Sequence, residues 1–505
     1  MKPENKNFIL FLIGSALISL CSAFLIWIQT SKYGIGDDMF FYPSMAQDVL
    51  NKGLDSVFYS SQVIYAPLYQ FVLACLSKIF GLSVIAVARG FNIFLIFVFS
   101  LLSMALCRKL TKNLAILFAF GLFIIFSRPV NLVFSFAWSE PLFIFIILII
   151  TFSVEKTTYK RLILSGFLTS LAILTRYAGV ALVPAICLYV FIQKNTLVEK
   201  IKKCFCYASL PTSTYIIYLI RNYYFTKTLM GPRTTSNTTF ISNCDRAFST
   251  VALWFSGSFY FLAILLFFVV GAFIWNYRNE LAIFFTNISE TVKFSLCFIL
   301  VYSCFIVIST TTTALDPLDD RFMVPVFIPV LLIVFSLIIF ACQITKKNKI
   351  LIAMLLATFT ICTVISFAKA WTKDIRVRKD HGAGGYNSEF WQENELIKYT
   401  KEHIQTNEYI FANNMLIRHI LLDHKFISYI PQKIDKETSG KPSGITLENL
   451  IEKYPHFENA YILWFAKGYE DIFFSINELR SICEINTTAD SLGNGTIFRV
   501  GKCKK

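Results

Sequence analysis

Two adjacent acids, Asp37 and Asp38, follow closely on a hydrophobic segment, residues 8–29, that is long enough to cross a membrane. A carboxylate at the edge of a bilayer can act as a general base and take the proton from an attacking hydroxyl group, which contributes about 10²–10⁴ in rate. Arginine side chains can bind a phosphate through two parallel hydrogen bonds and stabilise its charge as it departs. These residue types therefore suit attack by a hydroxyl group on a group carried by a lipid phosphate.

The composition is that of a membrane protein. Hydrophobic residues make up 55% of the 505 residues, charged residues only 16%, and the mean hydropathy is +0.59. A soluble protein carries more charge, about a quarter of its residues. Several apolar runs approach or exceed the roughly 18 residues that a bilayer-spanning helix needs. The sequence thus predicts a polytopic α-helical membrane protein of the cell inner or plasma membrane.

The distribution of positive charge sets the expected topology. The net charge is +15, and Lys and Arg gather in short clusters between apolar runs, at 107–112, 154–161, 193–203 and 345–349. Such clusters mark cytoplasmic loops. No basic face with interleaved aromatic residues is present, so we expect no nucleic-acid partner. No CxxC pair, HExxH motif or phosphate-binding glycine loop occurs, which argues against the metal, redox and nucleotide chemistry of those motifs.

With these clusters inside, the N-terminus is cytoplasmic and an odd number of spans leaves the C-terminal tail outside. About eleven spans are predicted, at 8–29, 84–106, 113–127, 134–153, 162–175, 177–192, 204–220, 251–275, 294–311, 323–343 and 349–368. The run 162–192 is too long for one span and is broken at 175–179, so we expect a hairpin with Arg176 at the outer surface. Residues 63–81 fit no span without reversing the topology, which predicts an outer-surface or partly re-entrant helix.

Residues 30–83 then form one large outer loop, in which Pro43 and Gly53 predict a helix at 43–52. Further ionisable residues fall on the same outer side, namely Glu140, Arg176, Arg221, Arg233 and Arg321. Charges near a bilayer are costly, so a set gathered at one membrane face predicts a functional site. The plainer interpretation of any one of them is a loop charge that faces water, or for Arg321 a side chain that reaches the interface from a span end.

The order of these features resembles the membrane-embedded GT-C-type glycosyltransferases that use polyprenyl-phosphate sugars. That family includes protein O-mannosyltransferases, lipid A aminoarabinose transferases and bacterial relatives. The resemblance covers nearly the whole chain and rests on the ordered segments DDMFFYPSMAQDVLNKG, YAPLYQFVLACLSKIFG, WSEPLF, LAILTRYAGVALVPA, LIRNYYFTKTLMGPR and DDRFMVPVFIPVLLI. It implies a GT-C-like fold, a polyprenyl-phosphate-linked sugar as donor, inverting hexosyl or pentosyl transfer, and chemistry at the outer face.

The resemblance also implies roles for single residues. Family members commonly show a first-loop acid, the catalytic base, with Tyr four residues on and a small residue eight residues on, which matches Asp38, Tyr42 and Ala46. Members with an Asp-Glu pair would make Asp37 the equivalent acid, so both acids remain candidates and Asp38 is preferred. Glu140 matches a second-loop acid that helps to organise acceptor or metal.

The four outer arginines are the implied contacts of the donor phosphate or sugar ring, namely Arg176, Arg221, Arg233 and Arg321. No cofactor is certain. The paired outer acids could bind a divalent metal ion or none. The acceptor could be a protein, a lipid or a glycan, and membrane lipid is the surrounding partner in every case.

A change in composition divides the chain into a transmembrane domain, 1–370, and a small extracytoplasmic α/β domain, 371–505. Four segments of the tail read as short strands and one as an amphipathic helix, namely 407–414, 425–432, 459–467 and 496–502 for the strands and 388–405 for the helix. Cys483 and Cys503 lie in this tail, where a disulfide would require an oxidising compartment.

Two other functions compete with transfer. A transporter or flippase for a lipid-linked sugar should place ionisable groups near the middle of the bilayer and often shows repeated halves. Here the centres of the predicted spans are almost free of charge, and the sequence shows no internal repeat. A polymerase or ligase of surface polysaccharide usually carries its arginines in a large later loop, whereas the largest loop of this membrane domain is the first. Transfer is therefore preferred.

Overall fold

The computed structural model describes residues 3–504 except 33, 36–40, 54–62, 64, 232, 234, 257–270, 272–287, 345–364, 366–367, 369–370, 372–374, 383–387, 415–416, 422, 425, 436–440, 443, 467–472 and 494. The chain divides into two compact units. The first, here called the helical unit, comprises Met1–Lys32 and Met45–Asp380. The second, here called the sheet unit, comprises Tyr33–Ser44 and His381–Lys505.

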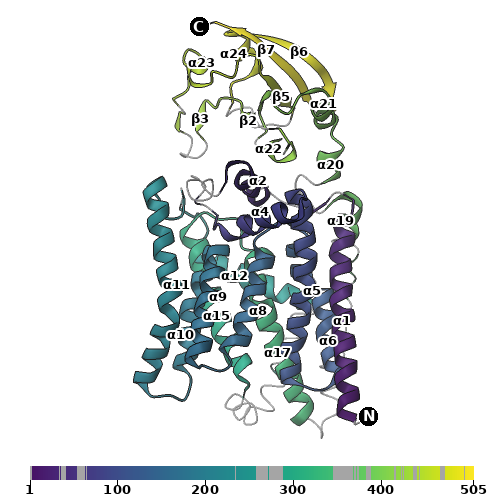
Figure 1. Ribbon diagram of the computed structural model, residues 1–505, viewed down its shortest axis with the longest axis vertical. Helices are drawn as coiled ribbons and strands as arrows, with labels where there is room; N and C mark the ends of the chain where they lie inside the picture. Colours follow the sequence, from purple (N-terminus) through teal and green to yellow (C-terminus); the bar gives the residue numbers. More distant parts are fainter. Residues whose placement is uncertain are drawn as a thin grey trace. The chain divides into compact units, whose positions relative to one another are not determined.

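Helices make up nearly all of the described structure before residue 381 (Figure 1). They are α1 (Pro3–Gln29), α2 (Phe41–Lys52), α4 (Leu68–Phe80), α5 (Val84–Leu110), α6 (Leu114–Ile125), α7 (Arg128–Phe134), α8 (Glu140–Val154), α9 (Tyr159–Thr175), η1 (Tyr177–Ala181), α10 (Leu182–Phe191), α11 (Leu197–Thr226), α12 (Phe240–Ser256), α15 (Glu290–Thr312), α16 (Asp320–Met323), η2 (Val324–Val326), α17 (Phe327–Ile344) and α19 (Arg376–His381). Among the described residues, four helices are long and apolar enough to cross a membrane, or five if the bent pair α6–α7 is one span.

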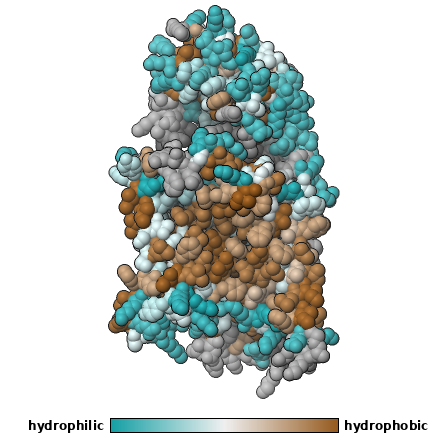
Figure 2. Space-filling view, in the orientation of Figure 1, coloured by the Kyte–Doolittle hydropathy of each residue, from teal (hydrophilic) through white to brown (hydrophobic). Residues whose placement is uncertain are grey.

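The surface of the helical unit agrees with burial in a membrane. On the face shown in Figure 2, a hydrophobic band occupies the middle of the unit, and hydrophilic residues gather at the end where α1 begins. A bilayer solvates such a band, whereas water would not. The chain is thus an integral membrane protein by its apolar helices, while the number of spans stays a prediction.

The region between the third and fourth predicted spans differs from the expectation. α6 ends at Ile125, and α7 starts at Arg128 after a bend of 50°. The side chain of Ser127 accepts a hydrogen bond from the backbone N–H of Val130, and Pro129 lies in the first turn, so the chain restarts a helix here. The predicted span 134–153 was therefore wrong at its start, because α8 begins at Glu140 and a non-helical segment precedes it.

The predicted break within 162–192 is confirmed. α9 ends at Thr175, Arg176 is extended with φ −151°, and the 3₁₀ helix η1 follows. η1 packs back against α9 so closely that a Cβ at Gly179 would lie 2.6 Å from the backbone of Ala172. Only glycine permits this approach without displacement, so the local sequence Arg-Tyr-Ala-Gly decides where the chain turns.

The first loop contains two described helices. α2 starts at Phe41 with Pro43 in its first turn and is followed by Gly53 at φ 78°, as the sequence predicted for 43–52. α4 has 13 residues and lies across the ends of the upright helices in Figure 1. Its Leu73 is buried and its Phe80 is 65% exposed, so it presents an apolar surface on both sides. It is too short to cross a bilayer, which needs about 17–25 residues.

The sheet unit has a five-stranded mixed sheet in the order β2-β1-β5-β7-β6. Its strands are β1 (Tyr409–Ala412), β2 (Phe426–Tyr429), β5 (Tyr461–Phe465), β6 (Cys483–Leu492) and β7 (Gly495–Cys503), and a separate pair joins β3 (Ile434–Asp435) to β4 (Lys441–Pro442). β1 pairs in parallel with β2 and β5, whereas β7 runs antiparallel to both β5 and β6. The helices of the unit are α20 (Glu389–Gln392), α21 (Glu395–His403), α22 (Ile417–Ile420), α23 (Leu450–Lys453) and α24 (Ile476–Arg480).

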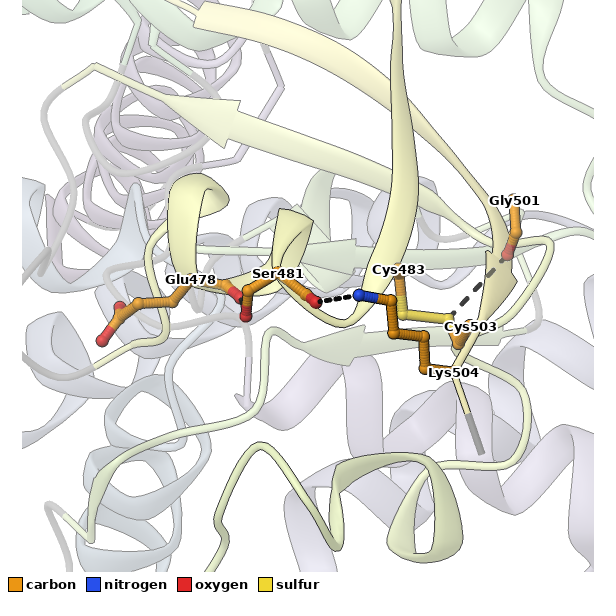
Figure 3. Close-up of a disulfide and its surroundings, with 6 residues drawn as sticks. All are labelled: Glu478, Ser481, Cys483, Gly501, Cys503 and Lys504. Atoms are coloured by element: carbon orange, nitrogen blue, oxygen red, sulfur yellow. Dashed lines mark hydrogen bonds between the residues drawn. A yellow bond between two sulfur atoms is a disulfide. The ribbon is translucent and has the colours of Figure 1, made fainter.

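The four predicted tail strands correspond to β1, β2, β5 and β7, and the predicted helix corresponds to α20 and α21. β6 was missed, because its polar residues hide the alternation and its pairing with β7 has register shifts. A disulfide joins the paired residues Cys483 and Cys503 across β6 and β7 (Figure 3). The ends of these two strands are thereby closed covalently.

Candidate functional site

Glu140, the first residue of α8, is fully buried and lies between two arginines. Nη1 of Arg176 lies 2.5 Å from Oε1 of Glu140, and Nε of Arg321 donates a hydrogen bond of 2.6 Å to the same oxygen. The two arginine side chains are only 15% and 18% exposed. We call Arg176, Glu140 and Arg321 the ion triad.

Three chain breaks position the ion triad. Glu140 starts a helix, where the helix dipole favours a carboxylate. Arg176 occupies the extended position between α9 and η1 and also donates from Nη1 to the hydroxyl of Ser139, at 3.2 Å. Arg321 lies in the short helix α16, which is capped by the side chain of Asp319. Each triad residue thus sits where a helix begins or ends.

An aromatic platform supports Arg321. Its guanidinium lies over the ring of Trp138, 4.5 Å from the centroid, and that ring stacks on Phe136 with 4.3 Å between centroids. The segment is fixed by Asn92 of α5, whose amide donates to the carbonyls of Phe134 (3.0 Å) and Phe136 (2.7 Å). The non-helical stretch before Glu140 is therefore held by specific hydrogen bonds, which place the ring of Trp138 against the guanidinium of Arg321.

Acids and a tryptophan surround the triad on the α16 side. Asp320 accepts a hydrogen bond of 2.8 Å from the indole nitrogen of Trp254, and its other oxygen lies 3.3 Å from Nε of Arg128. Arg128 is 59% exposed, so its charge is accessible to water. Burial raises the pKa of the neighbouring Asp319 carboxyl. A hydrogen bond from the backbone N–H of Arg321 acts in the opposite direction and lowers this pKa.

Two guanidinium groups at contact distance stabilise the carboxylate form of Glu140, since a buried charge is tolerated only when it is paired. The ion triad carries one negative and two positive charges, and Nη1 of Arg321 also lies 3.7 Å from the carboxylate of Asp316. Guanidinium groups present several N–H donors that can bind phosphate oxygens.

A second polar cluster follows directly in the chain at Tyr177. Its hydroxyl donates to the carbonyl of Val63 (2.5 Å) and accepts from the amide of Asn222 (2.9 Å). Arg221 donates to the side chain of Asn222 at 2.9 Å. Arg233 is exposed, its Nε donates to the carbonyl of Met230 at 3.2 Å, and its charge lies near Tyr177. This cluster joins α11 and η1 to Val63, in the segment between α2 and α4.

The predicted site residues are therefore divided. Glu140, Arg176 and Arg321 come together in the ion triad. The position of Arg176 at the outer surface of the membrane stays a prediction. Arg221 and Arg233 lie in the second cluster, and Tyr42 is buried in α2. Asp37 and Asp38 lie outside the described residues, so the base assignment stays a prediction.

The sequence analysis missed Arg128, Trp138 and Asn92. Arg128 had a recognisable signal, since a cation followed by proline ends an apolar run. Trp138 lies within the quoted segment WSEPLF but was not assigned a role. Asn92 could not be recognised from the sequence, because a single amide within an apolar run is equally consistent with a residue that only packs against its neighbours.

Among the residues that the structure describes, no group of three or more His, Cys, Asp or Glu side chains is placed to hold a metal ion. Glu140 is engaged by two arginines, which leaves it poorly suited as a metal ligand in this arrangement.

Together these features define a helical membrane protein with a buried Arg–Glu–Arg site at helix ends and a mixed-sheet unit after residue 380. No family model matches the chain, and no curated protein matches it by sequence. Solved structures match it by fold. Two are of ArnT from Cupriavidus metallidurans, in the apo state (TM-score 0.60) and bound to undecaprenyl phosphate (TM-score 0.59); each is 10% identical over 97% of this chain and 97% of that chain.

A third match is the archaeal oligosaccharyltransferase AglB from Archaeoglobus fulgidus, in complex with an inhibitory peptide and a dolichol-phosphate. It has a TM-score of 0.51 and 10% identity, over 90% of this chain and 69% of that chain. ArnT and AglB are GT-C-type membrane glycosyltransferases. The chain therefore has the GT-C fold, as the sequence resemblance implied.

Proposed function

We propose that this protein transfers a sugar from a polyprenyl-phosphate donor to an acceptor hydroxyl at the outer membrane face. The observation that carries the proposal is the fold likeness over 97% of the chain to a transferase captured with undecaprenyl phosphate. The two guanidinium groups of the ion triad support it, because the reaction releases a phosphate. The disulfide in the sheet unit supports an extracytoplasmic position of that unit, since such bonds persist in oxidising compartments.

In the proposed reaction a first-loop acid, Asp38 or else Asp37, takes the proton of the acceptor hydroxyl. The hydroxyl oxygen forms a bond to the anomeric carbon while the bond from that carbon to the phosphate oxygen breaks. Attack from the face opposite the phosphate inverts the configuration. The electron pair of the broken bond stays on the polyprenyl phosphate, which leaves as the second product.

The arginines have two tasks in this proposal. Arg176 and Arg321 stabilise the developing charge of the leaving phosphate, a contribution that is largest in a water-poor site. Glu140 fixes the direction of both guanidinium groups, since both bond to the same carboxylate oxygen. Arg221 and Arg233, which belong to the second cluster, are the candidates for contacts with the sugar ring or the lipid phosphate.

The test uses purified protein in detergent with radiolabelled polyprenyl-phosphate sugars and an extract of candidate acceptors. Wild type is compared with Asp37→Asn and Asp38→Asn, and Asp48→Asn is the matched control, since Asp48 is a first-loop acid paired with Lys52 on the surface of α2. We expect one of the first two variants to lose about 10²–10⁴ in rate with donor binding kept. Donor binding without transfer to any acceptor, unchanged by either substitution, would instead favour a transporter.

A further inference from the structure

Arg378 is a buried cation outside the ion triad. It lies in α19, the last helix of the helical unit, and is only 8% exposed. One guanidinium nitrogen, Nη1, donates to Oε1 of Gln29 and to Oγ of Ser135, each at 3.1 Å. Gln29 is the last residue of α1, and Ser135 is the residue that ends α7. Arg378 thus joins three segments that are far apart in the sequence.

The partners of Arg378 are themselves held in place. The amide nitrogen of Gln29 donates to Oδ1 of Asn131 at 3.1 Å, and the amide nitrogen of Asn131 donates to the carbonyls of Ile125 (2.7 Å) and Ser127 (2.9 Å). The hydroxyl of Ser135 donates to the carbonyl of Asn131 at 2.6 Å. This network fills the bend between α6 and α7, where the helix leaves backbone carbonyls without helical partners.

In the chain, the two partners of Arg378 come shortly before residues of the proposed site. Beyond Ser135 the chain continues to Trp138, whose ring contacts the guanidinium of Arg321, and then to Glu140 of the ion triad. Beyond Gln29 it enters the outer loop that contains Asp37 and Asp38. A shift of Ser135 would move Trp138 and Glu140, and a misplacement of about 1 Å can cost about a hundredfold in rate.

We propose that Arg378 is a positioning residue for sugar transfer, which fixes the start of the first outer loop relative to the segment that carries Trp138 and Glu140. The inference rests on the proposed function and goes beyond it, because it assigns a role to a residue outside the ion triad. It acts through Gln29 and Ser135. A buried guanidinium is costly unless it is hydrogen-bonded, so its bonds to Gln29 and Ser135 favour the arrangement of these segments.

The variants are Arg378→Gln, which removes the charge, and Arg378→Lys, which keeps a cation with several donors. Arg376→Gln is the matched control, because Arg376 lies in the same helix with a 74% exposed side chain, paired with Asp380 at 3.7 Å. Ser135→Ala removes one acceptor without a large change in volume. It serves as a milder probe if Arg378→Gln does not fold.

Each variant is measured for transfer kinetics and for backbone hydrogen exchange over residues 28–32 and 134–140. We expect Arg378→Gln to lower kcat about ten- to a hundredfold with the donor KM changed less than about threefold, and to speed exchange in both segments. Arg378→Lys should restore most of kcat, Ser135→Ala should show a smaller loss, and Arg376→Gln should match wild type.

Unchanged kcat and exchange in folded Arg378→Gln or in Ser135→Ala would overturn the inference, as would a Lys variant no better than the Gln variant. If wild-type protein transfers no sugar, the proposed function fails, and the exchange measurement still decides whether Arg378 holds the two segments. The two failures are therefore distinguishable.

Discussion

Nη1 of Arg176, which lies in the extended break between α9 and η1, is 2.5 Å from Oε1 of Glu140, the fully buried first residue of α8. The hydroxyl of the next residue, Tyr177, instead donates a hydrogen bond to the carbonyl of Val63, between α2 and α4. One short break in the chain therefore contributes to both the ion triad and the second cluster.

The ion triad should be asymmetric in its response to substitution. Glu140→Gln leaves two buried guanidinium groups without their carboxylate, so we expect a loss of about 3–5 kcal/mol in the free energy of unfolding. Arg321→Gln leaves Glu140 paired with Arg176, and we expect a smaller loss of about 1.5–3 kcal/mol. Denaturant unfolding in detergent measures both. A Glu140→Gln protein as stable as wild type would contradict the buried ion triad.

Tyr177→Phe should loosen the first outer loop. The substitution removes a hydroxyl that donates to Val63 and accepts from Asn222, so a carbonyl and an amide lose their partner at a cost of about 1–3 kcal/mol. Hydrogen exchange over residues 63–66 should become faster. The matched control is Tyr189→Phe, which removes a hydroxyl that donates to Glu290 at 2.8 Å, and should leave residues 63–66 unchanged. Equal exchange in both variants would argue against the contact.

Loss of the disulfide should destabilise the sheet unit. The bond between Cys483 and Cys503 closes a loop of 20 residues (Figure 3), which in the chain-entropy model is worth about 3 kcal/mol. We expect replacement of both cysteines by serine to lower the thermal midpoint of the unit and to increase cleavage by protease after residue 480. Wild-type protein treated with reductant should behave in the same way, and insensitivity of both samples would contradict this expectation.

The sheet unit should also lose stability in acid. The ammonium of Lys433, 2.6 Å from Glu478, lowers the pKa of that carboxyl to about 2, with further hydrogen bonds from Ser475. An unfolded glutamate titrates near pH 4.3. The folded pKa is the lower one, so the contribution of Glu478 is complete above about pH 4.5 and is lost as the pH falls towards 2.

The measurement for Glu478 is the thermal midpoint of wild type and of Glu478→Gln between pH 6 and pH 3. The difference between the two proteins should shrink as the pH falls. Because Glu478 is partly exposed, salt should reduce the effect as well. A difference that stays constant with pH would mean that the ion pair contributes nothing to stability.

Much of this protein could be predicted from its sequence because the signals are local. Apolar runs of sufficient length predict helices in a membrane, and Pro43 with Gly53 predicted α2 within two residues at its start. The break at Arg176 was visible because polar residues and Gly179 interrupt a run that is too long for one span. The alternation of apolar and polar residues in the tail predicted four strands. β6 shows no such alternation, because it is polar and its pairing with β7 has register shifts.

The sequence placed Glu140, Arg176 and Arg321 on one side of the membrane but could not pair them. Only the tertiary structure decided that both arginines share one carboxylate oxygen, because that depends on how α8, the α9–η1 break and α16 pack. The same holds for Arg378, which reads in the sequence as one cation among several in a charged stretch. Hydropathy and residue type can be read from the sequence. Whether a charged side chain is buried, and with which residue it pairs, is determined only when segments distant in the sequence pack together in the folded protein.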